Sequence, residues 1–548
     1  MLYYYRMKIL KPIILVFVIE FLLFLAMPGM GLPFADSHIT ANPTFANGML
    51  LLFGAIIAAV IWRLCERDKQ TRILLAAVVF FIGLYIIGLQ LPVKVLIHPQ
   101  LPDATLAQIK SVAFAGLLFA IGAALFVGIA RIRKYARPER IGIFIWPALF
   151  MILLVASAPQ FISNVSYVHH LNLDQPLPAQ YKPLYDPTFY WLVFDNMERG
   201  MPYTEAGKQA FGADSRTADD FYPTNLGSWR FPTKYILWTT FADTAYGVFV
   251  LYLIGIAVIF LCIHLIAIRI APPEFGAIGM WMIMPFIQAN ILDLWFFMTD
   301  WWGMFPFMVG LTALIYKRHK IAIIFFSMAL ITRENILIPL AAVSLCLLIL
   351  KRWRLFLATG IPLVAMFLMI AFHYHNLRHL VEGSFLNQLG SYVYWSRIAQ
   401  ATSESFWVKG ILWNTLRSGN FTYFFHPIVL PMLFALALAG TAWAIIKKQR
   451  EALIVIGAGA FTALAMFHLG TPTIERFEGS IYWNILYVPI MASGVGIFLW
   501  LLSQRVWQPP SLVGIFSFAS NNNIAPINER NKPCSCGSGK KYKKCCEK

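Results

Sequence analysis

Charged side chains are scarce in this sequence. Of its 548 residues, 13% are Asp, Glu, Lys or Arg and 59% are hydrophobic, and the mean hydropathy is +0.66. This composition excludes an ordinary soluble fold. The apolar runs also lack the alternating pattern of a β-barrel, and they recur at about the 20 residues that a helix needs to cross a bilayer. We therefore predict an all-α polytopic membrane protein.

The sequence also lacks a single basic patch of the kind that binds nucleic acid, although its formal net charge is +18. Its Lys and Arg residues cluster between the apolar runs, at 6–11, 63–72, 131–140, 317–320, 351–354 and 447–450. Placing these clusters in the cytosol gives about fourteen spans in the inner membrane, with both termini cytosolic. The stretch that follows the first run, 13–27, lacks a clean small-x-small cleavage site, so we interpret this run as a retained span rather than a signal peptide.

Cysteine is rare, and four of the seven cysteines lie in the C-terminal tail. Cys534, Cys536, Cys545 and Cys546 have C-x-C-x8-C-C spacing, which suits tetrahedral zinc and does not suit a disulfide framework in a reducing cytosol. The segment closely resembles the SEC-C motif, which implies one structural Zn²⁺ held by these four thiolates. The lysines between the cysteine pairs are expected to bind an acidic protein partner or anionic lipid, or only to offset the thiolate charge.

Composition shifts divide the chain into four parts. Residues 1–140 are predicted to form a four-span N-terminal extension, and 141–505 a transmembrane core. Residues 506–531 are predicted to form a cytosolic linker, and 532–548 the zinc knuckle. The core carries two long outer loops, at about 160–241 and 373–423. We expect the chemistry in these loops, because loops held on a rigid scaffold commonly carry function.

The first outer loop contains an expected short helix. Asp186 suits its N-cap, Pro187 suits the first helical position, and Gly200 suits a C-terminal stop. We predict an amphipathic helix lying along the membrane surface. Tyr190 is one turn from Asp186 and shares its face.

These residues resemble polyprenyl-phosphate-dependent GT-C glycosyltransferases, whose first outer loop begins with an acid at the head of a juxtamembrane helix. Asp186 and Tyr190 match that pattern, and the segment 231–235, which includes Lys234, resembles the Lys-Pro-Pro-like segment before the next span. Pro187 stands where the family commonly has a second acid. The resemblance covers about 141–502 and implies a GT-C-like core of about ten spans behind about four extra ones.

The resemblance implies a sugar transfer from a polyprenyl-phosphate donor to an envelope acceptor on the outer face. Asp186 would act as the base of an inverting displacement, with Tyr190 and Lys234 in the substrate site. The alternative for Asp186 is a helix N-cap and nothing more. Whether the site also uses a divalent metal stays open.

A second group of site residues follows from chain length. Two helical passes between the basic clusters 317–320 and 351–354 reach only about 22 Å each, less than the roughly 30 Å of a bilayer core. The turn at 332–335 therefore lies below the outer surface, where Arg333 and Glu334 must face protein or water. Arg333 is a candidate ligand for the donor phosphate. A mutually satisfied structural ion pair is the alternative.

Arg476 precedes the last expected span and resembles a family signature of Arg-Tyr followed by Pro. We interpret it either as a second phosphate ligand or as an interfacial anchor. His373, His375 and His379 fall at the second outer loop, where solvated histidines are more common than metal ligands.

Two other functions remain open. A multispan transporter or flippase would also carry many helices and buried charges, but no matched pair of broken helices is evident. An export-associated scaffold working through its zinc knuckle would explain the tail but not the acid-headed outer loop.

Overall fold

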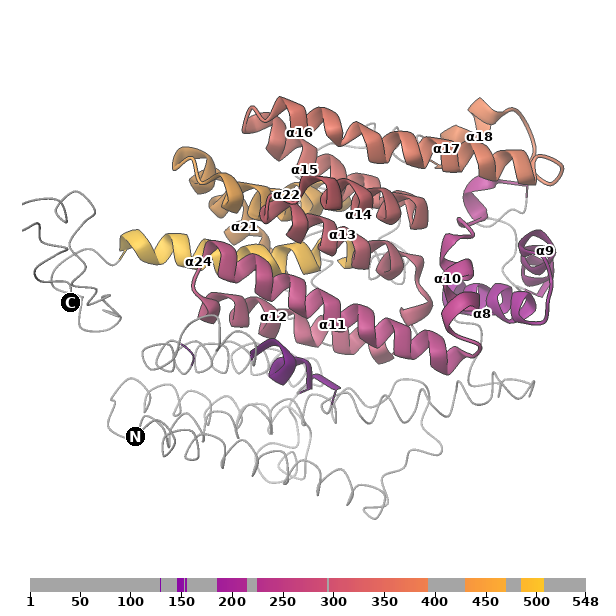
Figure 1. Ribbon diagram of the computed structural model, residues 1–548, viewed down its shortest axis with the longest axis horizontal. Coiled ribbons are helices and arrows are strands. Elements are labelled where there is room, and N and C mark those ends of the chain that lie inside the picture. Colours follow the sequence, from indigo (N-terminus) through magenta and orange to yellow (C-terminus); the bar gives the residue numbers. More distant parts are fainter. Residues whose placement is uncertain are drawn as a thin grey trace, which may run out of the picture. The chain divides into compact units, whose positions relative to one another are not determined.

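The computed structural model describes residues 129, 145–151, 153–154, 185–213, 224–292, 295–392, 429–469 and 484–506 (Figure 1). The regular elements in these ranges are all helices, which confirms the all-α prediction for this part of the chain. The predicted linker and zinc knuckle, and nearly all of the four-span extension, lie outside the described residues. The chain forms two compact units, 1–501 and 502–548, and the packing below is that of the first.

The described residues form α-helices and short 3-10 turns. The α-helices are α8 (Tyr185–Glu198), α9 (Tyr203–Ala213), α10 (Thr233–Phe241), α11 (Ala245–Ile270), α12 (Pro273–Leu292), α13 (Thr299–Ile315), α14 (His319–Thr332), α15 (Leu337–Ile349), α16 (Trp353–Ala358), α17 (Gly360–Leu377), α18 (Phe385–Tyr392), α21 (Val429–Ile446), α22 (Arg450–Leu469) and α24 (Val488–Val506). Single 3-10 turns join some of them, namely η3 (Leu226–Ser228), η4 (Trp295–Phe297), η5 (Glu334–Ile336) and η7 (Asn484–Leu486).

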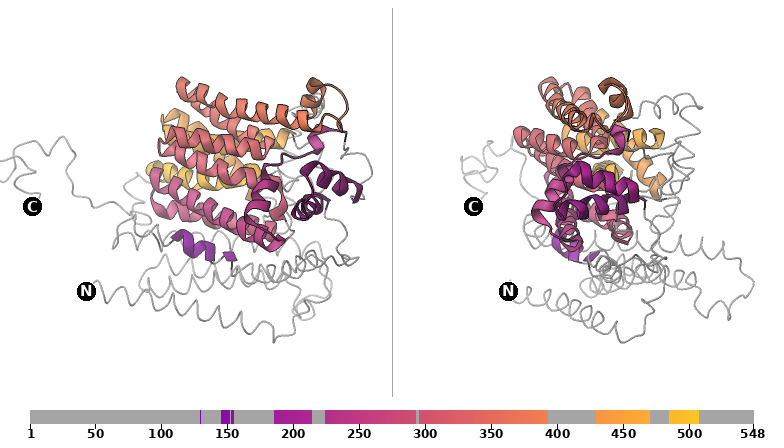
Figure 2. Two further views of the ribbon diagram at one scale, coloured as in Figure 1. Left: turned by 45° about the vertical axis from the view of Figure 1, so that its right-hand side comes forward. Right: turned by 90° about the vertical axis from the view of Figure 1, so that its right-hand side faces the viewer.

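Helix α13 is the centre of the bundle. Its residues are buried along almost its whole length, as expected of a helix that is apolar on every side. It packs against α11 and α14, α14 packs against α17, and α15 packs against α22, which also contacts α21 (Figures 1 and 2). Helices α8, α9 and α10 lie at one end of this bundle, at the right in Figure 1.

Two stretches among the described residues are long and apolar enough to cross a membrane. They are Ala245–Ile270, which is α11, and Trp353–Leu377, which joins α16 and α17. The second is mostly exposed, and Val364 and Leu368 lie on its open apolar face. This finding is consistent with membrane association, whereas the count of about fourteen spans stays a prediction.

The short helical hairpin expected from the basic clusters is present. Helix α14 has 14 residues and α15 has 13, so each rises about 20 Å, less than the roughly 30 Å of a bilayer core. The turn between them contains Arg333 and Glu334, as predicted. Both residues are buried, so these charges are surrounded by protein rather than solvent.

Basic residues form the turns at the other end of the bundle. Lys317, Lys351 and Lys448 end α13, α15 and α21 in the left-handed conformation, with φ of 61°, 56° and 53°. Lys317 Nζ lies 3.9 Å from Glu451 Oε1, which brings the α13–α14 turn to the start of α22. These turns lie at the left in Figure 1, opposite α8, α9 and α10. Three of the clusters expected in the cytosol therefore share one end of the bundle.

Helices α12 and α24 approach so closely that only glycine fits at the contact. A Cβ on Gly279 would lie 2.2 Å from the backbone oxygen of Ala492, and one on Gly496 would lie 2.1 Å from that of Phe275. Small residues at such contacts are typical of helices that associate in a membrane.

We expect Gly496→Ala to destabilise the protein by about 1–3 kcal/mol, because the added methyl must push α24 away from α12. Gly360→Ala is the matched control, since a Cβ there meets no heavy atom within 4 Å. The midpoint of thermal unfolding, measured for both variants in one detergent, should fall only for Gly496→Ala. Equal midpoints would contradict this packing.

Candidate functional site

Helix α8 carries the predicted catalytic acid and the predicted tyrosine. It begins one residue before Asp186, which therefore lies in its first turn, and Tyr190 follows one turn later. The side chain of Asp186 lies outside the described residues. The predicted stop is present, because Gly200 has a φ of 87° and allows Met201 N to donate to Asn196 O over 3.1 Å, as in a Schellman motif.

Helix α8 packs against its neighbours on several sides. Its buried side chains are Phe189, Tyr190, Trp191, Val193 and Phe194. Helices α9 and α10 and the turn η4 pack against it. The helix exists as predicted, and Asp195 and Arg199 form an ion pair on its exposed side. Its position along the membrane surface stays a prediction.

Arg230 precedes α10 and joins the elements of the site. Its Nε donates to the Tyr190 hydroxyl over 3.1 Å, and its Nη1 donates to Gly227 O over 2.6 Å. Its backbone oxygen accepts a hydrogen bond from the Tyr203 hydroxyl of α9. Burial raises the pKa of Tyr203 well above its usual range, so this hydroxyl stays protonated and remains a donor.

Lys234 lies in the first turn of α10 with no exposed surface. Its Nζ donates to the Thr299 hydroxyl over 2.8 Å and lies 3.2 Å from the centre of the Tyr190 ring, a cation–π contact. The neighbouring Thr233 donates to Ile331 O over 2.6 Å, which ties α10 to the end of α14. The predicted site residues Tyr190 and Lys234 are thus in direct contact.

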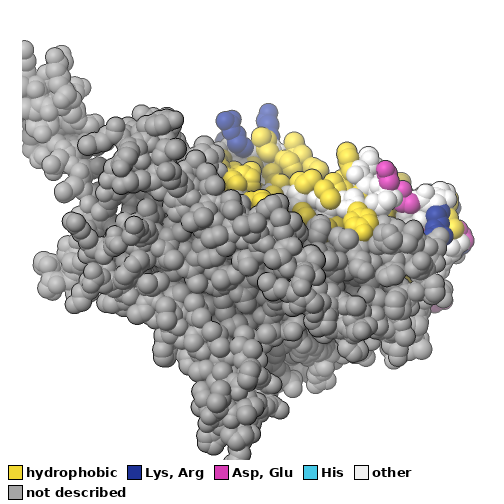
Figure 3. Space-filling model, turned by 90° about the horizontal axis from the view of Figure 1, so that it is seen from below, with side chains coloured by type: hydrophobic (Ala, Val, Ile, Leu, Met, Phe, Trp, Pro, Cys, Tyr) yellow, Lys and Arg dark blue, Asp and Glu magenta, His cyan; other side chains and the backbone are white. Residues whose placement is uncertain are grey.

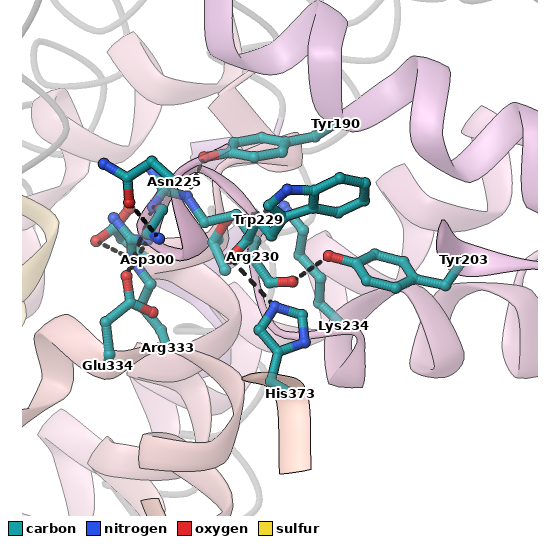
Figure 4. A network of polar contacts seen from close by, with 12 residues as sticks. Tyr190, Tyr203, Asn225, Trp229, Arg230, Lys234, Asp300, Arg333, Glu334 and His373 are labelled. Carbon is teal, nitrogen blue, oxygen red and sulfur yellow. Dashed lines mark hydrogen bonds and ion pairs between the residues drawn. The ribbon is translucent and has the colours of Figure 1, made fainter. Parts of the chain in front are cut away.

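Arg333 lies at the centre of the ionic contacts (Figure 4). Its Nε donates to Asp300 Oδ1 over 3.0 Å, and its Nη1 donates to Glu334 Oε1 over 2.8 Å. Asp300 lies in the first turn of α13 and Arg333 caps the end of α14, so each charge also has the sign that its helix dipole favours. Gly303 makes this approach possible, because a Cβ there would lie 2.7 Å from that of Arg333.

Glu334 connects the two arginines. Its Oε1 lies 3.7 Å from Arg230 Nη1 and also accepts from Arg333. Glu334 Oε2 and Asp300 Oδ2 are buried and accept no hydrogen bond from a described residue. Each acid therefore has one oxygen engaged and one that the described side chains leave unused.

His373 of α17 completes this end of the bundle. It is buried, and its Nε2 lies 3.4 Å from Trp229 O, beside Arg230. The interpretation of His373 as a solvated loop residue is wrong, because α17 continues to Leu377 and places it inside a helix. Among the described residues, no three His, Cys, Asp or Glu side chains lie close enough to hold a metal ion.

The structure brings together four residues expected from the sequence. Tyr190, Lys234, Arg333 and Glu334 meet at the end of the bundle near α8, α9 and α10 (Figure 4). Arg476 and the four tail cysteines lie outside the described residues, so their roles stay predictions.

Arg230 and Asp300 were not predicted as site residues. Asp300 is a lone charge in an apolar segment, beside Trp301 and Trp302. Such a charge requires a partner, which is the reasoning that singled out Arg333 and would also have selected Asp300. Arg230 falls in the predicted outer loop, where a charge is ordinary, so the same signal does not select it.

Three basic side chains meet in this network. They are Arg230, Lys234 and Arg333, and the described acids among them are Asp300 and Glu334. Buried guanidinium and ammonium groups of this kind recognise phosphate and carboxylate groups. An anionic ligand is therefore the chemistry that this end of the bundle suits.

The comparison with protein families matches the tail alone. The model of the SEC-C motif, a zinc-binding motif, matches residues 530–548. No curated protein and no solved structure matches the chain. The tail thus carries a SEC-C motif, while the helical unit is interpreted from its own geometry.

We expect Arg333→Met to destabilise the protein by about 3–5 kcal/mol, because it leaves Asp300 and Glu334 as buried charges without their main partner. Arg199→Met is the control, since Arg199 pairs with Asp195 over 2.9 Å on the surface and its loss should cost about 0–1 kcal/mol. Unfolding in detergent with increasing denaturant would measure both. A small effect at Arg333 would mean that the network is not a buried ionic contact.

Proposed function

We propose that the protein is a membrane glycosyltransferase that moves a sugar from a polyprenyl-phosphate donor to an acceptor of the cell envelope on the outer face. The observation that carries this proposal is the buried network of Arg230, Lys234, Arg333 and the two acids at one end of the helical bundle. A glycosyl polyprenyl phosphate is a phosphodiester with a single negative charge. Buried guanidinium and ammonium groups are suited to bind that phosphate charge.

The distribution of charge along the bundle supports the outer face as the location of the network. The basic turns of Lys317, Lys351 and Lys448 lie at the opposite end, and such turns prefer the cytosolic side. Figure 3 shows hydrophobic side chains over much of the described part of the face seen from below, with Lys and Arg at both ends of it and Asp and Glu towards the right-hand end. Multi-pass insertion with both termini in the cytosol is part of this proposal.

An apolar surface beside the network supports a lipid donor. Helix α10 buries Lys234 on one side and exposes Ile236, Leu237 and Phe241 on another. Helix α11, which follows it directly, exposes Val250. A prenyl chain along this surface would bring its phosphate to the network, because the same short helix carries both features.

The proposed reaction is a single displacement. The acceptor hydroxyl oxygen bonds to the anomeric carbon, and the bond from that carbon to the phosphate oxygen breaks with the electron pair leaving on the lipid phosphate. Asp186 takes the hydroxyl proton, and the buried cations, with Arg476 as a further ligand, offset the growing phosphate charge. Asp186 is one helical turn from Tyr190, which contacts both Arg230 and Lys234.

We expect Asp186→Asn to lower the transfer rate by at least about a hundredfold, because an amide cannot accept the hydroxyl proton. Asp195→Asn on the same helix should retain the wild-type rate, since Asp195 pairs with a surface arginine. The measurement is transfer of labelled sugar from purified polyprenyl-phosphate donors to extracted envelope acceptors in matched membranes. If Asp186→Asn transfers sugar at the wild-type rate, Asp186 is not the catalytic base. If the wild type itself transfers no sugar, a transporter or scaffold is favoured.

We further propose that the SEC-C tail binds one structural Zn²⁺ through Cys534, Cys536, Cys545 and Cys546. The purified protein should contain about one zinc per chain by elemental analysis, and Cys545→Ser should remove most of it. Cys262→Ser is the matched control, because Cys262 is a free buried thiol of α11 and should leave the zinc content unchanged. Equal zinc in both variants would contradict the tail site.

A further inference from the structure

Asp300 and Glu334 hold acceptor capacity that the described residues do not use. Their exposed fractions are 0% and 6%, and each gives one oxygen to Arg333. Asp300 Oδ2 and Glu334 Oε2 are buried and have no described donor. Both acids flank the same guanidinium, so the unused oxygens belong to one site (Figure 4).

A buried carboxylate oxygen without a donor is costly, because it has given up its hydrogen bonds to water. The fold holds both acids in place regardless. Asp300 is fixed at the start of α13, Glu334 is fixed in the turn η5, and Gly303 lets these two elements meet. Two oxygens held in this way are prepared for a ligand that supplies hydrogen-bond donors.

Charge decides which donor fits. A divalent cation between these carboxylates would lie close to the Arg333 guanidinium, which already contacts both of them and would repel it. A neutral hydroxyl adds no charge and donates directly to a carboxylate oxygen, which is among the stronger hydrogen bonds available. Hydroxyl groups are therefore the favoured ligand chemistry.

We propose that Asp300 and Glu334 bind the sugar of the donor, each accepting a hydrogen bond from a sugar hydroxyl through its unused oxygen. This inference rests on the proposed function and assigns separate binding roles to the residues of the network. Arg230 and Lys234 bind the phosphate, whereas the acids held by Arg333 bind the sugar and determine which sugar is accepted. Arg333 is then a positioning residue, because it orients both carboxylates.

The test compares two lipids of equal charge. One probe is a set of polyprenyl phosphates that carry glucose, mannose or galactose, and the other is cyclohexyl polyprenyl phosphate, whose ring has no hydroxyl. Binding is followed by the tryptophan fluorescence of the detergent-solubilised protein, since Trp229 and Trp238 adjoin the network. We expect the wild type to bind at least one sugar lipid about tenfold more tightly than the cyclohexyl lipid.

The variants Glu334→Gln and Asp300→Asn keep the oxygen that faces Arg333 and replace the unused oxygen by an NH2 group. For each variant, the preference for the sugar lipid over the cyclohexyl lipid should fall from about tenfold to about one to twofold. The cyclohexyl lipid should bind as tightly as before or more tightly, because a negative charge has been removed. Glu198→Gln, at the exposed end of α8, is the matched control and should keep the full ratio. Thermal unfolding of each variant establishes that it is folded.

The outcomes separate this inference from the proposed function. Binding of neither lipid class to the wild type would contradict the proposed function itself. Equal binding of the sugar and cyclohexyl lipids, or a ratio that survives in both acid variants, would overturn the sugar assignment and leave phosphate recognition intact. If neither variant folds, the test uses the wild type with deoxy-sugar lipids. Removing a bound hydroxyl must then lower the affinity for the sugar lipid relative to the cyclohexyl lipid.

Discussion

A guanidinium group that has left water must find its partners within the protein, and the partners of Arg333 are residues of different helices. Asp300 comes from the start of α13 and Glu334 from the turn that leads into α15. Glu334 then reaches Arg230, whose side chain holds Tyr190 of α8 and whose carbonyl oxygen holds Tyr203 of α9. The requirement to pair one buried charge therefore positions the layer of short helices against the end of the bundle.

The two ends of the helical unit differ in their charged groups. Turns containing Lys317, Lys351 and Lys448 lie at one end, where each lysine closes a helix, and the buried network of acids and bases lies at the other. Helices α13, α14 and α15 run between these ends, so their dipoles alternate and favour an acid at the start of α13 and a base at the end of α14. The helix dipoles therefore stabilise the ion pair of Asp300 and Arg333 at the end where it lies.

Features set by local rules were predictable from the sequence. Gly200 as a helix stop follows from its left-handed conformation, and the buried turn of Arg333 follows from the distance between two basic clusters. The packing of α8 against α9, α10 and η4 and the burial of His373 were not predictable, because both depend on elements that are distant in sequence. Arg230 illustrates the limit, since its contact with Glu334 joins residues more than a hundred positions apart. The roles of Asp186 and Arg476 stay predictions, because the described side chains do not include them.

The two interpretations of Arg333, structural ion pair and ligand site, are compatible. Two carboxylates bind this arginine, which is the structural interpretation, yet each of them keeps a buried oxygen that no described residue uses. A ligand that carries several hydroxyls can supply donors to both oxygens without breaking the ion pair. Under the proposed function, the ion pair would be the scaffold that holds both carboxylates in place for the sugar of the donor.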